Sequence, residues 1–190
     1  MALTAQERQI LLELARQTIA RVARGEAPPH VDLSRLPEAL ARPGASFVTL
    51  TVDGELRGCI GTLEAHRPLA QDVQENAIGA AFRDPRFPPV SAGEVDDLHI
   101  EISVLTMPQP LSYSDGNDLL SKLRPLVDGV VIEQGWHRAT FLPQVWEKLP
   151  DPREFMAHLC LKAGLPPDAY RRGGLEVLTY QVEKFEEEPS

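Results

Sequence analysis

Two strand-like runs, 46–52 and 55–60, are separated by the dipeptide Asp53-Gly54 alone, and this spacing constrains the fold more than any other feature. Asp-Gly is a preferred pair for the two-residue type I′ turn, because both positions of that turn adopt positive φ and its twist matches that of antiparallel strands. The sequence therefore predicts a tight antiparallel hairpin in the N-terminal part of the chain.

The turn also predicts which residues are neighbours across the hairpin, because side chains that face one another on paired strands share a face of the sheet. In an unbroken register, Leu50 faces Arg57 and Val48 faces Cys59. Cys59 is then expected among aliphatic side chains. Apolar residues occur on both faces of this hairpin, which predicts a sheet that is partly covered on both sides.

Helical patterns flank the hairpin. Thr4 and Glu7 have the spacing of a capping box, in which each side chain satisfies a free amide of the first helical turn. Pro68 suits the first position of a second helix. Proline disfavours helical geometry in the residue before it, so Asp84-Pro85 is expected to end that helix. Periodicity and turn residues predict further elements: a strand over 98–105, a helix over 117–123, a hairpin around Gln134-Gly135, a helix over 152–163 and a strand over 175–185.

Strands in antiparallel hairpins with helices between them are typical of the α+β class rather than of a doubly wound parallel sheet. We therefore predict an antiparallel β-sheet flanked by helices. The whole chain, 1–190, is expected to be a single domain with a small second subdomain, since 190 residues suit one domain of ordinary size. The acidic end of the chain, 186–190, is expected to be a solvated tail.

Composition argues against several classes of function. The net charge of −9 opposes binding to nucleic-acid phosphates, which depends on clustered Lys and Arg. No apolar run approaches the roughly 20 residues of a membrane-spanning helix, and the first residues lack the pattern of a signal peptide, so a cytoplasmic protein is expected. Cys59 and Cys160 are the only cysteines and form no CxxC pair. We expect reduced thiols, with no metal and no cofactor.

Five motifs occur in an order that resembles one known family. They are 56–61 (LRGCIG), 84–89 (DPRFPP), 100–105 (IEISVL), 140–145 (TFLPQV) and 162–165 (KAGL). Together they are similar to the AMMECR domain family, which is called AmmeMemoRadiSam system protein A in prokaryotes. The likeness extends from about Leu11 to the last predicted strand, and five ordered motifs are far more specific than one.

The resemblance implies a two-part α+β fold with an antiparallel sheet flanked by helices. It also implies an association with a Memo-type protein and a radical S-adenosylmethionine (SAM) enzyme, and a role in nucleic-acid or nucleotide modification has been suggested for the family. One position departs from the pattern. Some relatives carry a histidine before the glycine of the second hairpin, where this chain has Asp128, so a mechanism that needs an imidazole there is not supported.

The segment 57–61 is the first candidate site. Gly58 and Gly61 lack side-chain bulk, so a ligand or another backbone segment can approach the strand closely. Arg57 lies near Cys59 in sequence, and a neighbouring cation favours the thiolate, the form that acts as a nucleophile. The alternative is that Cys59 is a buried core residue, since cysteine is among the most often buried residue types.

Asp84 and Arg86 flank a proline and form the second candidate site. Arg86 has the planar fork of donors that grips a carboxylate or phosphate; alternatively it pairs with Asp84 and fixes the turn. Glu101 is a candidate general base. It alternates with His99 and Ser103, but residues two apart on a strand are separated by about 7 Å, too far for a catalytic relay. A solvated strand face explains that alternation.

Two hypotheses of function remain open. The first is an accessory or binding protein of a Memo-type and radical SAM pathway that presents 57–61 and 84–89 to a partner. The second is an enzyme that modifies a small molecule, a nucleotide or RNA in a pocket at 57–61, with Cys59 or Glu101 as the reacting group and Arg57 and Arg86 holding an anionic substrate. The first is favoured, because the sequence contains no complete catalytic set.

Overall fold

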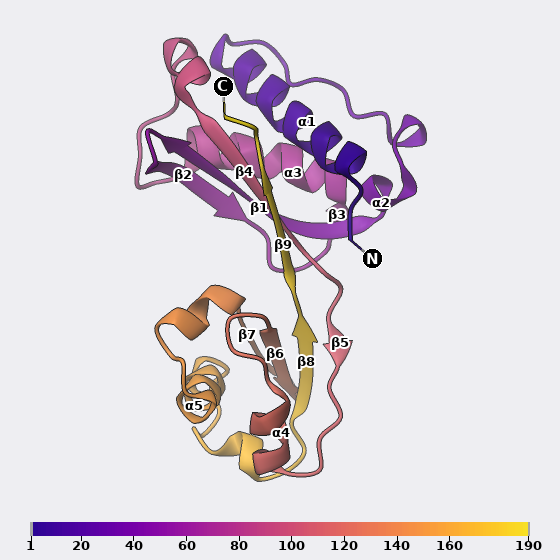
Figure 1. Cartoon of the computed structure of the whole chain (residues 1–190), viewed down its shortest axis with the longest axis vertical. Coiled ribbons are helices and arrows are strands. Elements are labelled where there is room, and N and C mark those ends of the chain that lie inside the picture. Colours follow the sequence, from indigo (N-terminus) through magenta and orange to yellow (C-terminus); the bar gives the residue numbers. More distant parts are fainter. Residues whose placement is uncertain (1, 190) are drawn as a thin grey trace. The chain divides into compact units, whose positions relative to one another are not determined.

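The computed structural model describes residues 2–189 and divides into two compact units (Figure 1). One unit contains the residues up to 105 together with those from 183 onward, and the other contains residues 106–182. Each unit has its own antiparallel sheet and its own hydrophobic core. The predicted α+β fold, an antiparallel sheet flanked by helices, is confirmed.

The sheet of the first unit has five strands, in the order β2-β1-β4-β9, with β3 paired to one end of β1. Asp53 and Gly54 join β1 to β2 with φ values of 50° and 81°, as a type I′ turn requires. β2 is an edge strand. The strands are β1 (Pro43–Val52), β2 (Glu55–Gly61), β3 (Arg67–Pro68), β4 (His99–Leu105) and β9 (Val182–Glu186).

Two helices, α1 (Ala5–Ala23) and α3 (Leu69–Ile78), cover one face of this sheet, and in Figure 1 the strands β1, β4 and β9 pass in front of α3. The capping box of Thr4 and Glu7 begins α1 as predicted. α3 continues as a π-helical turn, Gly79–Arg83, that ends before Asp84. Smaller helical elements are η1 (Leu33–Arg35), α2 (Glu38–Ala41) and η3 (Ala92–Asp97). The core joins both helices to alternate residues of β1 and β4: Leu11, Ile19, Val48, Leu50, Val73, Ile100 and Ile102.

The second unit has a four-stranded sheet in the order β5-β8-β6-β7. Its β6–β7 hairpin turns at Gly135, as predicted. Trp146 and Phe155 stack at 3.7 Å between ring centroids in its core. The elements are β5 (Gln109–Pro110), α4 (Gly116–Lys122), β6 (Gly129–Gln134), β7 (His137–Phe141), η4 (Pro143–Glu147), α5 (Pro152–Lys162), η5 (Ala169–Arg171) and β8 (Glu176–Tyr180).

The C-terminal segment differs from the prediction in two respects. The single strand predicted over 175–185 is wrong: the chain forms β8 and β9, which belong to different sheets. The acidic end is not simply a solvated tail either, since Glu187 accepts hydrogen bonds from Arg16 and from the backbone of Ile100. These contacts hold Glu187 against α1 and β4. Among the helices of residues 2–189, none has the length and apolar sequence that crossing a bilayer requires.

Candidate functional site

Strand β2 departs from regular pairing at Arg57. Thr51 pairs with Leu56, whereas the preceding residue of β1, Leu50, pairs with Gly58. Arg57 is therefore the extra residue of a β-bulge. Such bulges are common at sheet edges, where they redirect side chains.

The bulge changes the neighbours of the thiol. Cys59 pairs with Thr49 and not with Val48, so the predicted register is wrong beyond Arg57, because one additional residue moves every following side chain to the other face. Cys59 is half-buried, and its Sγ lies 3.3 Å from the Thr49 Oγ1. The thiol is consequently on the face opposite the aliphatic core that contains Val48 and Leu50.

The two glycines of the motif are in contact with atoms of the protein itself. A Cβ at Gly58 would lie 2.0 Å from the carbonyl oxygen of Ala80 in the π-helical turn, and one at Gly61 would lie 2.2 Å from the ring of Phe47. Both positions therefore require glycine for packing. The sequence alone left open whether a ligand or another backbone segment approaches Gly58. In the structure it is the backbone of Ala80.

The loop that follows the π-helical turn is bound to the outer edge of β2. Asp84 Oδ2 accepts a hydrogen bond from the backbone N–H of Cys59 at 3.0 Å and from Arg86 Nη2 at 2.7 Å. Asp84 Oδ1 accepts from the backbone N–H and the Nε of Arg86, both at 3.0 Å. Arg86 Nη2 also approaches the carbonyl oxygen of Cys59 at 3.4 Å. The two candidate segments, 57–61 and 84–89, therefore form one site.

Electrostatics stabilise this arrangement. Asp84 is only 4% exposed, and a buried carboxylate is tolerated where its oxygens are paired and hydrogen-bonded. The Arg86 guanidinium, together with the backbone N–H of Cys59, holds the pKa of Asp84 well below its usual range. Asp84 in turn raises the pKa of Arg86. The guanidinium side that does not contact Asp84 faces outward, since the Arg86 side chain is 55% exposed.

Arg57 is engaged with a different acid. Its Nη2 donates to Glu94 Oε2 at 3.0 Å, and Glu94 also accepts from the backbone N–H of Ser91 in the capping box that begins η3. Ser91 and Glu94 form this capping box reciprocally, each side chain accepting from the other residue's backbone N–H. Within the described residues, the Arg57 Nη1 is buried and has no hydrogen-bond partner. Arg57 thus ties the bulge of β2 to the segment that precedes β4.

Glu101 lies on the same face of the sheet as Cys59. Thr49 pairs with Cys59 on one side and with Glu101 on the other, so the backbones of Cys59 and Glu101 are about 10 Å apart across two strand spacings. His99 occupies this face as well, and its Nε2 lies 2.7 Å from Glu186 Oε2. The half-buried carboxylate of Glu101 has no hydrogen bond or ion pair among residues 2–189.

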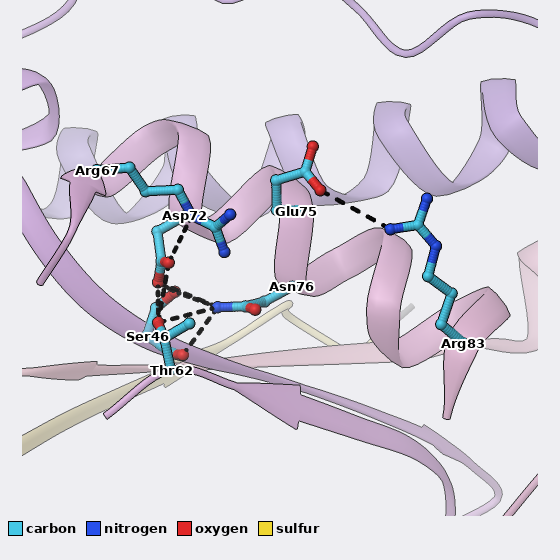
Figure 2. A network of polar contacts seen from close by, with 7 residues as sticks. All are labelled: Ser46, Thr62, Arg67, Asp72, Glu75, Asn76 and Arg83. Carbon is cyan, nitrogen blue, oxygen red and sulfur yellow. Dashed lines mark hydrogen bonds and ion pairs between the residues drawn. The ribbon is translucent and has the colours of Figure 1, made fainter. Parts of the chain in front are cut away.

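Sequence reasoning missed a buried polar network beside this site (Figure 2). The Asp72 carboxylate of α3 is 1% exposed and accepts hydrogen bonds from Ser46, Thr62 and Asn76 as well as from Arg67 Nε at 2.8 Å. The network joins α3 to β1 and to the chain after β2. Its residues are far apart in sequence, and only the paired i, i+4 spacing of Asp72 and Asn76 on the buried helix face could have indicated it.

In the second unit, Asp128 is a structural residue. Its carboxylate accepts from the Arg124 Nη2 at 2.8 Å and from the Gln181 Nε2 at 3.0 Å. Its backbone oxygen accepts from the buried indole of Trp146 at 2.7 Å. The residue that stands where some relatives have histidine therefore fixes the start of β6. Throughout the part of the chain that the structure describes, no three His, Cys, Asp or Glu side chains converge as metal ligands.

Comparisons with known proteins agree with this fold. A family model described as AMMECR1 matches residues 12–185. A protein of Methanothermobacter thermautotrophicus is 41% identical over 98% of this chain and 97% of its own length. Protein MJ0810 of Methanocaldococcus jannaschii is 38% identical over 97% of this chain and 92% of its own length. The crystal structure of protein PH0010 from Pyrococcus horikoshii, 34% identical, superposes with a TM-score of 0.74 over 98% of this chain and 94% of that one. The chain belongs to the AMMECR1 family.

Proposed function

We propose that this protein is an accessory, partner-binding component that works with a Memo-type protein and a radical SAM enzyme. The partner contacts the surface formed by 57–61 and 84–89. The observation that carries this proposal is the attachment of Asp84 and Arg86 to the backbone of Cys59, which builds one rigid surface from two distant motifs. The association with those two partners comes from the family resemblance.

The contacts of the site favour binding over catalysis. Both arginines that were candidates for holding an anionic substrate are already paired, Arg57 with Glu94 and Arg86 with Asp84. The space over Gly58 and Gly61 is taken by protein atoms. A guanidinium that is positioned by one carboxylate and still half-exposed is well suited to contact a protein partner, because arginine presents several donors in a fixed geometry.

Measuring complex formation between purified proteins tests the proposal. The full chain is mixed with the Memo-type protein and with the radical SAM enzyme of the same organism, and affinity is measured by calorimetry. Arg86→Gln is expected to weaken binding roughly tenfold, because it removes one charge-assisted hydrogen bond to the partner. Arg83→Gln is the matched control. It removes the same charge from an exposed arginine outside the two segments, whose one ion pair, with Glu75, is long at 4.0 Å. Absence of any complex, or full affinity of Arg86→Gln in a protein with an unchanged melting temperature, would contradict it.

One observation supports the second hypothesis, an enzyme with Cys59 as its nucleophile. Cys59 is half-buried rather than sealed in the core, and its Sγ contacts a hydroxyl. A catalytic thiol reacts faster than an ordinary one, because its thiolate fraction is larger at neutral pH. The rate of alkylation at pH 7 relative to glutathione distinguishes the two hypotheses: a faster Cys59 supports the enzyme, and an equal or slower one supports the binding protein.

A further inference from the structure

The chain enters β6 through a tight turn over 124–127. The backbone N–H of Val127 donates to the carbonyl oxygen of Arg124 at 3.1 Å. Pro125 is the second residue of this turn, and the third, Leu126, has a φ of 67°. Proline followed by a residue of positive φ is the pattern of a type II turn, whose third position ordinarily holds glycine or asparagine.

Leucine is strained in this conformation, because positive φ brings the Cβ of an L-residue too close to a backbone carbonyl oxygen. Among residues 2–189, only Asp53 and Leu126 combine a positive φ with a side chain. Aspartate tolerates the left-handed region, since its short polar side chain can hydrogen-bond locally. A bulky apolar residue has no such compensation, so Leu126 is the clear outlier of the described backbone.

The surrounding contacts hold Leu126 in place. Asp128 is 2% exposed, and its carboxylate accepts from the backbone N–H of Arg124 at 2.9 Å and from the Arg124 Nη2 at 2.8 Å. Gln181 Nε2 donates to the same carboxylate at 3.0 Å. The backbone N–H of Asp128 donates in turn to the Arg124 carbonyl oxygen at 3.0 Å. Strained residues persist where their surroundings determine the geometry, and they cluster at functional sites.

Burial does not offset the strain. Leu126 is 64% exposed, the most of any leucine that the structure describes, and the adjacent Val127 is 44% exposed. Glycine at position 126 would relieve the strain and remove exposed apolar surface at once. In the free protein the leucine therefore brings two costs with little burial in return, and a contact made outside this chain is what would offset them.

We propose that the Leu126 side chain enters an apolar pocket of the protein partner, so that residues 125–127 form a second contact of the complex. This inference rests on the proposed function and specifies the chemistry of the partner. The tip of a turn is convex, so its counterpart is a concave site on a protein rather than a flat lipid surface. A tip that is already held in its binding geometry loses less conformational entropy on association.

The charges beside the turn favour an apolar counterpart over a charged one. Arg124 pairs with Asp128 at 2.8 Å, and Lys122 pairs with Asp118 at 3.0 Å. Both cations are thus matched within the chain. The groups that remain for a partner at this tip are the apolar side chains of Pro125, Leu126 and Val127.

Calorimetry with the full chain, the Memo-type protein and the radical SAM enzyme tests the inference. Leu126→Gly is expected to weaken the complex roughly tenfold or more, since the burial of a leucine side chain on binding is lost. The same substitution is expected to keep or raise the melting temperature of the free protein, because glycine adopts positive φ without strain. A residue with a purely structural role would lose stability instead.

Leu161→Ala is the matched control. Leu161 is a leucine of α5 that is 57% exposed and has helical backbone, so its truncation is expected to leave affinity and melting temperature unchanged. A Leu126→Gly variant that binds as tightly as the wild type, or one that melts at a lower temperature, would overturn the inference. If the wild type binds neither protein, the proposed function fails and this inference with it, whereas equal binding by Leu126→Gly removes the inference alone.

Discussion

Asp84 Oδ2 accepts a hydrogen bond from the backbone N–H of Cys59 at 3.0 Å, and this contact joins a loop to the free edge of a sheet. Arg86 approaches the carbonyl oxygen of the same residue at 3.4 Å. The two side chains therefore occupy the groups that an additional strand would pair with. Exposed edges promote aggregation unless they are covered, so the pair both protects β2 and fixes the geometry of the site.

Asp84→Asn is expected to lower the free energy of unfolding, because the amide cannot pair with Arg86 through two anionic oxygens. The effect depends on pH. The folded-state pKa of Asp84 lies below its unfolded value, so its contribution is fully present above the unfolded pKa of about 3.9 and is lost as the pH falls through the folded pKa. Denaturant unfolding of both proteins at decreasing pH should show their difference shrinking below about pH 4. If the difference in free energy of unfolding between the wild type and Asp84→Asn stays constant with pH, the charge of Asp84 is not the cause of its stabilising effect.

Gly58→Ala is expected to destabilise the protein by about 3 kcal/mol, because the new Cβ would meet the Ala80 carbonyl and move the π-helical turn away from β2. Gly93→Ala is the control, since nothing lies within 4 Å of a Cβ there. That substitution should change stability by no more than about 0.5 kcal/mol. Thermal and denaturant unfolding measure both. Similar values for the two variants would mean that the close approach at Gly58 does not exist in solution.

Much of the fold follows from local signals, and the errors have definite physical causes. The Asp53-Gly54 turn, the capping box of Thr4 and Glu7 and the alternation of β4 depend on residues close in sequence. The bulge at Arg57 does not, because it exists where the π-helical turn and Glu94 meet the edge strand. An unbroken register was therefore the natural but wrong expectation.

The site itself was predicted in part. Both segments, 57–61 and 84–89, were selected as candidates from their motifs, and the structure brings them together through the hydrogen bond between Cys59 and Asp84. The partners of Arg57 and the unmatched state of Glu101 depend on contacts between distant segments, which periodicity does not report. The single strand over 175–185 failed for a similar reason: alternation continues through a segment whose halves pair with different sheets.

Asp72→Asn is expected to lower the free energy of unfolding by about 2 kcal/mol, since an amide cannot accept all the hydrogen bonds that the buried carboxylate accepts from Ser46, Thr62 and Asn76. Glu75→Gln lies on the same helix and provides the matched control (Figure 2). Its carboxylate is 4.0 Å from Arg83 and half-exposed, so that change should cost at most about 0.5 kcal/mol. Equal losses in chemical denaturation would show that the Asp72 network does not stabilise the fold.

Only one of the two thiols should react in the native protein. Cys59 is only half-buried, whereas Cys160 is fully buried in the core of the second unit. Burial also raises the pKa of Cys160, which lowers the fraction of reactive thiolate. Native alkylation followed by mass spectrometry is expected to label Cys59 alone, and denaturation should expose both. Modification of Cys160 under native conditions would contradict the packing around α5.

Hydrogen–deuterium exchange of the complex with the Memo-type protein tests the central claim, that 57–61 and 84–89 form one partner-binding surface. Binding is predicted to slow exchange in both segments together, while the exposed side of α1 keeps its rate. A stable complex in which 57–61 and 84–89 exchange as fast as in the free protein would contradict the account.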